Sequence, residues 1–309
     1  PVCSTMLGKS AFPEGHPQYV GIYNGEAGDP RVRDIVEQSD CLLMLGVFMT
    51  DINLGLFTAH LDPSRTVYAT SERIVIRHHE YTNVLFEHFI RELAARNDLP
   101  RFDPSTIEPM RPRVGPDEGR ITMSGLLYEL NQFIDENTLL VTDVGDALFA
   151  SDDIQTREGT SFLCPAYYTS MGFGVPGVVG AQLADPRRRA VALVGDGAFQ
   201  MTGMEIVTAR KLGLKPVVIV IHNGVYGSLR AMGHENAEFV NIADIDYAQF
   251  ACALGGCGVV VETAQQMRHA LQASRHADRF TLLDVRIAPD DVSPALRRLG
   301  ELFAGRLRG

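Results

Sequence analysis

The sequence predicts an α/β protein of two domains, each with a parallel sheet flanked by helices. Apolar stretches of strand length alternate with stretches in which apolar residues recur every three to four positions. The length of 309 residues also suits two domains. Residues 97–119 hold five prolines and several charges, so we expect a linker there, between domains at 1–96 and 120–309. A long surface loop is the alternative interpretation of this segment.

The first 96 residues are expected to contain two strands and two helices. Residues 29–39 have helical spacing and precede a short buried strand at 41–47. A second strand is expected at 66–70. A second helix is expected at 82–96, with Thr82 as its N-cap.

The second half alternates more regularly. A helix at 122–136 leads to a strand at 138–144, and the glycine-rich stretch 170–180 opens a helix of small residues. The further strands are expected at 190–194, 216–221, 259–262 and 280–287, and the further helices at 198–212, 247–254, 264–274 and from 294 onward.

Charge and cysteine content exclude several classes of function. Lysine and arginine number 28 and aspartate and glutamate 38, so the net charge of −10 argues against nucleic acid or an anionic membrane as partner. No run of 18 apolar residues exists, so no membrane span is expected. The five cysteines form no CxxC pair, which disfavours a disulfide framework or a structural zinc site and favours a reducing, cytoplasmic setting.

The most informative motif is Gly195-Asp196-Gly197, which ends an apolar strand and opens a helix. Glycine lets a ligand approach the backbone, and the following helix start offers N–H groups that suit phosphate. A carboxylate in that place would repel phosphate unless a divalent cation lay between them. Asp196 therefore suggests a phosphate bridged by Mg²⁺. An Asp-Gly turn without function is the alternative.

A second element, His222 and Asn223, is separated from Gly197 by 24 residues. That length holds one helix and one strand, which return the chain to the same sheet edge by a right-handed crossover. Asn223 is then expected beside Asp196, where an amide oxygen is a further hard ligand for Mg²⁺. Open α/β sheets bind ligands at this edge.

These residues carry a family resemblance. Gly-Asp-Gly followed about 25 residues later by Asn resembles the diphosphate-binding signature of thiamine diphosphate enzymes. Residues 166–177, the turn at 143–146 and the Gly-Leu-Lys-Pro run at 213–216 look like the C-terminal domain of 2-oxo acid decarboxylases, in particular the indolepyruvate and phenylpyruvate branch. Residues 1–5, 28–29 and 40–46 look like the central, non-catalytic domain of that branch. The resemblance implies a thiamine diphosphate-binding fold at 120–309 and part of a Rossmann-like central domain at 1–96.

The resemblance also implies residue roles at the diphosphate end of the cofactor. Asp196 and Asn223 would ligate Mg²⁺ together with the main-chain carbonyl of Val225. The diphosphate would lie against the main chain of the strand end and helix start, at Gly195, Gly197 and Ala198.

Further roles are implied around the rest of the cofactor. Asp146 lies in the turn that would approach the diphosphate from the other side. Main-chain atoms of Thr169 and Met171 would bond the aminopyrimidine, and the Met171 side chain would prop the cofactor in its bent form. A core methionine is the alternative for Met171.

Two positions depart from the family pattern. His222 stands where the family usually has Asn, and is expected to be either a packed strand-end histidine or a proton donor in the site. Leu229 stands where pyruvate-type decarboxylases have a catalytic glutamate. The resemblance therefore implies a pocket with room for a larger, apolar side chain of the substrate.

The implied activity is the non-oxidative decarboxylation of a 2-oxo acid to an aldehyde and CO₂, in a homodimer or homotetramer. An acetolactate synthase-like carboligase and a catalytically silent nucleotide-binding or assembly subunit are the alternatives. The family needs a pyrimidine-binding domain, which supplies a glutamate, and residues 1–110 do not resemble it. We expect the chain to be a part of a longer polypeptide, inactive alone; a natural split enzyme with a separate subunit is the alternative.

Overall fold

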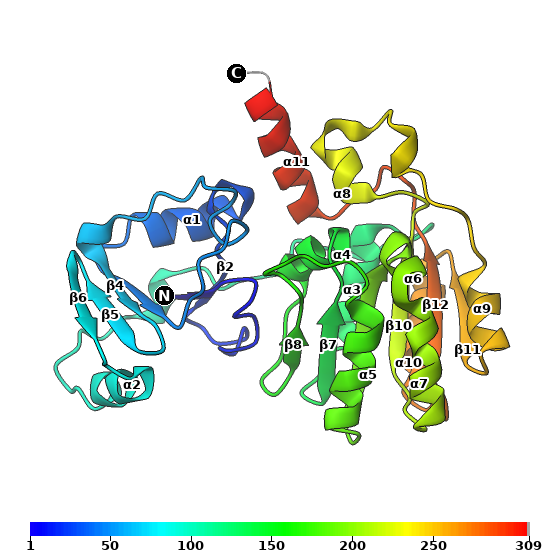
Figure 1. The fold of residues 1–309 in the computed structure, drawn as a ribbon, viewed down its shortest axis with the longest axis horizontal. Coiled ribbons are helices and arrows are strands. Elements are labelled where there is room, and N and C mark those ends of the chain that lie inside the picture. The colour runs from blue at the N-terminus through cyan, green and yellow to red at the C-terminus, as the bar shows by residue number, and fades with distance from the viewer. Residues whose placement is uncertain (308–309) are drawn as a thin grey trace. The chain divides into compact units, whose positions relative to one another are not determined.

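The computed structural model describes residues 1–307 and divides the chain into two units (Figure 1). The first unit consists of residues 1–12 and 16–110, and the second of residues 13–15 and 111 onward. The change from one unit to the other at Met110 falls within the segment 97–119, which contains one short helical turn, η3 (Pro104–Thr106).

The second unit is built on a six-stranded, wholly parallel sheet. Its strands run in the order β11-β12-β10-β9-β7-β8. Their bounds are β7 Thr138–Thr142, β8 Ser161–Leu163, β9 Arg189–Gly195, β10 Val217–His222, β11 Cys257–Val261 and β12 Thr281–Arg286. Every residue of β7 is buried, and the other central strands are buried over nearly their whole length. Continuous apolar runs of this kind are typical of strands covered on both faces.

Helices cover both faces of this sheet. Leu140, Leu193 and Ile219 point to one side and pack with α3 (Met123–Phe133) and α10 (Ala264–Ser274). The alternate strand residues point to the other side and pack with four helices: α5 (Gly174–Ala184), α6 (Asp196–Thr202), α7 (Ile206–Lys211) and α9 (Tyr247–Ala253). This two-sided arrangement confirms the predicted α/β fold class.

The remaining helices lie in the connections that follow the carboxyl ends of the strands, and all but the last, which has 14 residues, are short. They are α4 (Asp146–Phe149), η4 (Ala150–Asp153), η5 (Gly203–Glu205), α8 (Gly227–Leu229), η6 (Arg230–His234), η7 (Glu238–Val240) and the terminal α11 (Pro294–Leu307). The expected strands and helices of this unit are all present, with bounds shifted by a few residues, and the helix at 198–212 is divided into α6, η5 and α7. The short strand β8 was not expected.

The first unit has two small sheets. The parallel pair β1 (Val2–Ser4) and β2 (Tyr19–Ile22) is separate from a four-stranded sheet of order β3-β4-β5-β6. The four strands are β3 Leu42–Leu45, β4 Thr66–Ala69, β5 Arg73–Ile76 and β6 His79–Thr82. Helices α1 (Pro30–Glu37) and α2 (Phe86–Ala94), with the turns η1 (Gly25–Ala27) and η2 (Pro63–Arg65), complete the unit.

Three expectations for this unit were wrong. The strand at 41–47 is only half buried, because Leu42 and Met44 of β3 face the core while Leu43 and Leu45 are exposed. The sheet is mixed rather than parallel. The connections after β4 and β5, of three and two residues, leave no room for a crossover, and β5 pairs antiparallel with both β4 and β6. Thr82 is not a helix N-cap, because it ends β6, and α2 begins later with Leu85 at the N-cap. Among residues 1–307, no helix is long and apolar enough to cross a membrane.

Candidate functional site

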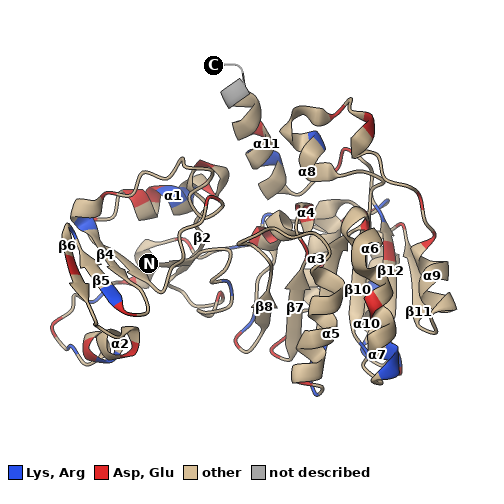
Figure 2. Ribbon diagram, in the orientation of Figure 1, with Lys and Arg blue, Asp and Glu red and all other residues tan. Residues whose placement is uncertain are grey.

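The candidate site lies at the carboxyl edge of the six-stranded sheet. Strands β9 and β10 pair in parallel with Ile221 opposite Gly195, so Asp196 and Asn223 follow directly at neighbouring strand ends. Of the six strands only β12 carries an acidic residue, Asp284, and the other acidic positions that Figure 2 colours red in this unit lie in helices and loops. The position predicted for Asn223 beside Asp196 is confirmed.

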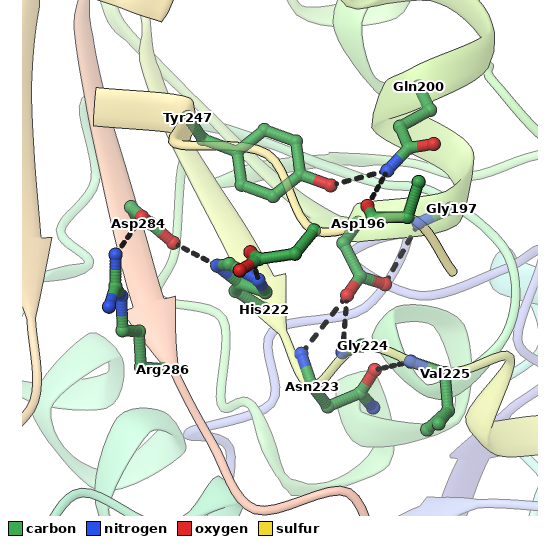
Figure 3. Close-up of polar contacts among 12 residues, drawn as sticks. Asp196, Gly197, Gln200, His222, Asn223, Gly224, Val225, Tyr247, Asp284 and Arg286 are labelled. Carbon is green, nitrogen blue, oxygen red and sulfur yellow. Dashed lines mark hydrogen bonds and ion pairs between the residues drawn. The ribbon is translucent and has the colours of Figure 1, made fainter. Parts of the chain in front are cut away.

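Asp196 is the first residue of α6 and its carboxylate is buried, with 2% of the residue exposed. Oδ2 accepts hydrogen bonds from the main-chain N–H of Asn223 at 3.1 Å and of Gly224 at 2.7 Å (Figure 3). Oδ1 accepts from the N–H of Gly197 at 2.9 Å. Burial raises the pKa of this carboxyl and the three N–H donors oppose the rise. The turn after β10 is thus tied to the start of α6.

Asn223 and Val225 complete the turn. The Asn223 side-chain oxygen accepts from the main-chain N–H of Val225 at 3.1 Å, and both residues are buried. Gly197 is packed closely here, because a Cβ at that position would lie 2.4 Å from Cε1 of Tyr226. The helix start at Ala198 is buried too. The Asp196 carboxylate and the Asn223 amide oxygen are therefore both held by main-chain N–H groups of this turn.

His222 is held by carboxylates on both ring nitrogens (Figure 3). Its Nδ1 lies 2.7 Å from Oδ1 of the fully buried Asp284, on the neighbouring strand β12, and its Nε2 lies 3.2 Å from Oδ1 of Asp244. The hydrogen bond with Asp284 raises the pKa of His222. Tyr247 packs edge-on against the ring at a centroid distance of 4.9 Å. These contacts fix the ring at the strand end, and both interpretations given above, packed histidine and proton donor, stay predictions.

The turn after β7 brings Asp146 to the same edge, but its carboxylate faces α11. It accepts from the main-chain N–H of Ser293 at 3.0 Å and makes a second, short hydrogen bond with the Ser293 hydroxyl. Burial raises the pKa of Asp146 to about 6. Any contact of Asp146 with a diphosphate would therefore involve its main chain.

The segment 169–174 carries two of the predicted residues. Thr169 has φ of 51°, a left-handed conformation that is costly for a β-branched residue. Met171 is 37% exposed, so it is not a core methionine of this chain. The main chain beyond it is bonded to the buried carboxylate of Asp143, which lies at the end of β7. Leu229, in α8, is 36% exposed.

The residues singled out by sequence fall into one neighbourhood. Asn223 and Val225 share the turn after β10, which is bonded to Asp196 at the start of α6, while Asp143 connects the 169–174 segment to the same sheet edge. Sequence reasoning missed the roles of Asp143, Ser293 and Asp284. Asp143 carried a signal, because it directly follows an apolar strand, whereas the partners Ser293 and Asp284 come from distant parts of the chain.

The donor set suits Mg²⁺ only together with an anion. Among residues 1–307, no group of three or more His, Cys, Asp or Glu side chains could hold a metal ion. Asp196 contributes one carboxylate, and the oxygens of Asn223 and Val225 are neutral. Mg²⁺ sites of this composition are completed by phosphate oxygens and water. The residues therefore fit a magnesium–diphosphate group better than a bare cation.

Comparison with known proteins gives consistent matches over both units. Residues 143–285 match the C-terminal TPP-binding domain of thiamine pyrophosphate enzymes, and residues 1–85 match the central domain of the same enzymes. The resemblance inferred from the motifs is thereby confirmed.

Curated relatives align along nearly the whole chain. An indole-3-pyruvate decarboxylase of Azospirillum brasilense is 32% identical over 96% of this chain and 55% of its own length. An alpha-keto-acid decarboxylase of Mycolicibacterium paratuberculosis is 30% identical over 92% of the chain and 52% of its own length. An alpha-keto-acid decarboxylase of Mycobacterium tuberculosis is 29% identical over the same shares. The chain thus spans about half the length of the curated relatives it matches.

Proposed function

The chain belongs to the thiamine pyrophosphate enzyme family, of which it carries the central and C-terminal domains, and we propose that it serves the decarboxylation of a 2-oxo acid to an aldehyde and CO₂. The observation that carries the proposal is the pairing of Asp196 with the Asn223 turn at adjacent strand ends, inside the segment matched as TPP-binding. The names of the aligned relatives, which are decarboxylases of 2-oxo acids, support the same reaction.

We propose that Asp196, Asn223 and the carbonyl of Val225 hold Mg²⁺, and that the main chain at Gly195, Gly197 and Ala198 holds the diphosphate. When bound, thiamine diphosphate supplies the electron sink that the carbon–carbon cleavage needs. The chain's own task at this end is to position the cofactor through its diphosphate. The bonds from Asn223 and Gly224 to Asp196 support this, because they fix the carboxylate before any ligand arrives.

The most direct test is Asp196→Ala, measured by calorimetric titration of the 309-residue chain with thiamine diphosphate in the presence of Mg²⁺. Loss of a residue that only orients a metal ligand lowers metal affinity about 10–100-fold. Loss of a direct ligand should therefore weaken cofactor binding about 100-fold or more. Removal of Mg²⁺ with a chelator should have the same effect on the unaltered chain.

The matched control is Asp278→Ala, because Asp278 is exposed and pairs with the neighbouring Arg279. It should bind the cofactor as the unaltered chain does. Tight, Mg²⁺-dependent binding by a folded Asp196→Ala variant would refute the assignment of the site.

We further propose that Leu229 borders the substrate and favours aromatic or bulky apolar 2-oxo acids. In the enzyme completed with its pyrimidine-binding domain, Leu229→Glu should then lower kcat/KM for phenylpyruvate more than for pyruvate, because a carboxylate beside an apolar ring must be desolvated at a cost of about 1–3 kcal/mol. Leu212→Glu is the control, since Leu212 is exposed beyond α7 at the opposite sheet edge. Equal losses for both substrates would show that Leu229 does not border the substrate.

We propose that turnover also requires a pyrimidine-binding domain and a homo-oligomer, since the relatives are nearly twice as long as their matched part. Decarboxylation assays with and without such a domain, and light scattering of the assembled protein, test both points. The five free cysteines support a reducing, cytoplasmic setting.

A further inference from the structure

Asp143 is a buried carboxylate that the proposed chemistry does not use. It directly follows β7 and has no exposed surface. Its Oδ1 accepts from the main-chain N–H of Val144 at 2.8 Å and of Gly172 at 3.1 Å, and its Oδ2 accepts from the N–H of Gly174 at 2.6 Å. Two of these three donors belong to a segment about 30 residues further along the chain. Asp143 therefore joins a strand end to a distant loop.

That loop, residues 169–174, is strained and closely packed. Thr169 has φ of 51° and Gly172 has φ of 88°. The loop is also held from α6, where the Thr202 hydroxyl donates to the carbonyl of Gly172 at 2.7 Å. A Cβ on Gly174 would lie 2.6 Å from the side chain of Val194, so the loop sits directly on the sheet. Backbone strain persists only where the surroundings hold it, and such places concentrate at functional sites.

A carboxylate is the side chain best suited to accept these three main-chain hydrogen bonds. Its two oxygens accept three or four hydrogen bonds and donate none, which matches three converging N–H groups. An amide of the same size has one accepting oxygen, and its NH₂ group would face one of the N–H donors. Burial raises the pKa of Asp143, while the N–H donors of Gly174, Val144 and Gly172 oppose the rise.

We infer that Asp143 is a positioning residue, which holds the 169–174 loop so that Thr169 and Met171 are ready for the thiamine portion of the cofactor. The inference rests on the proposed function for the identity of the ligand. The site then has two parts, each held in place by different residues. Asp196 and its turn serve the diphosphate, and Asp143 with Thr202 serves the loop that would meet the organic rings.

The test compares two ligands on the 309-residue chain, thiamine diphosphate and inorganic pyrophosphate, each titrated with Mg²⁺. Asp143→Asn should weaken thiamine diphosphate binding about 10–100-fold, the range typical for a group that orients a ligand-binding residue, and change pyrophosphate binding less than about 3-fold. Amide hydrogen exchange at Gly172 and Gly174 should become faster. A general loss of structure would weaken both ligands alike.

Asp135→Asn is the matched control, because Asp135 lies before the opposite end of β7 and also accepts a main-chain N–H, from Asn137 at 3.0 Å. It should leave both affinities unchanged. Thr202→Val, which removes the second anchor of the loop, should act in the same direction as Asp143→Asn but less strongly, and it serves if the Asn variant does not fold.

Equal weakening of both ligands in Asp143→Asn and Thr202→Val, or unchanged exchange at Gly172 and Gly174, would overturn the inference. Failure of the unaltered chain to bind either ligand would refute the proposed function instead. In that case the exchange rates would still decide whether Asp143 holds the loop.

Discussion

The two larger sheets of the molecule differ in how their strands are covered. In the six-stranded sheet, all of β7 is buried and Leu283 of β12 has no exposed surface. In the four-stranded sheet, all of β6 is exposed, and Leu43 of β3 is 41% exposed. The six-stranded sheet is packed between helices on both faces. The four-stranded sheet has only alternate residues in a core.

This difference explains where the chemistry lies. Where a strand is buried on both faces, the first polar residues after it are also shielded from solvent. Asp143, Asp196 and Asp284 are all buried carboxylates at or near such ends. Within the described residues of the four-stranded sheet, the acidic side chain of Glu80 is instead exposed and pairs with Arg73. Covered sheets can therefore build a site of fixed carboxylates, whereas a half-covered sheet gives solvated ion pairs.

The largest expected effect is on the core of the six-stranded sheet. Leu283 lies between Ile219 and Val259 on the neighbouring strands. Leu283→Ala should lower the free energy of unfolding by about 2–5 kcal/mol, because it leaves a cavity that packed neighbours cannot fill. Urea unfolding followed by circular dichroism measures this, since the chain has no tryptophan. Leu283→Met is the control and should cost less than about 1.5 kcal/mol. Similar losses for both variants would mean that the sheet is not tightly packed.

A smaller, pH-dependent effect is expected at Asp146. Its pKa is raised to about 6 by burial, so the folded chain binds a proton between about pH 4 and 6 that the unfolded chain has lost. The free energy of unfolding therefore falls as pH rises through this window. Asp146→Asn does not titrate, so its stability relative to the unaltered chain should rise by about 2–3 kcal/mol between pH 4 and 7. Thermal unfolding at a series of pH values measures the difference.

The exposed Asp62 in the first unit is the control for this experiment. Hydrogen bonds from Ser64 lower the pKa of Asp62, so its stabilising contribution is present at neutral pH and is lost as pH falls. Asp62→Asn should therefore lose stability relative to the unaltered chain as pH rises, with the opposite sign to Asp146→Asn. Parallel pH curves for Asp146→Asn and the unaltered chain would contradict the burial of a protonated carboxyl.

How much of the fold the sequence could predict also depended on whether helices cover both faces of a sheet. Strands of the covered sheet are continuous apolar runs, so β7, β9, β10 and β12 were found. The hairpin of β5 and β6 was missed, because β6 is almost wholly polar and exposed and the turn at Arg77 uses φ of 55° without a glycine. A strand that faces solvent on one side resembles a loop in composition. Its identity depends on pairing rather than on apolar content.

Prediction of the site had a similar limit. Asp196 and Asn223 could be identified because their positions follow from strand ends and chain length between them. Their roles as ligands stay a prediction. The partners that orient the site, Ser293 for Asp146 and Asp284 for His222, lie 147 and 62 residues away in sequence. No local sequence pattern predicts these pairs. The pair of His222 and Asp284 depends on the register of two strands, and the pair of Asp146 and Ser293 depends on how helix α11 packs.

The smallest effect is expected on the exposed face of β3. Leu43 and Met44 are neighbours on one strand with opposite orientations, and Met44 is only 8% exposed. Leu43→Ala should lower the free energy of unfolding by about 1 kcal/mol, because 41% of Leu43 is exposed and only part of its apolar surface is removed from water on folding. Met44→Ala, on the buried face, should cost about 2 kcal/mol or more. Both are measured by urea unfolding of the first unit's transition. If Leu43→Ala cost as much as Met44→Ala, the exposed face of β3 would be covered in the assembled protein, and the contrast between the two sheets would not hold there.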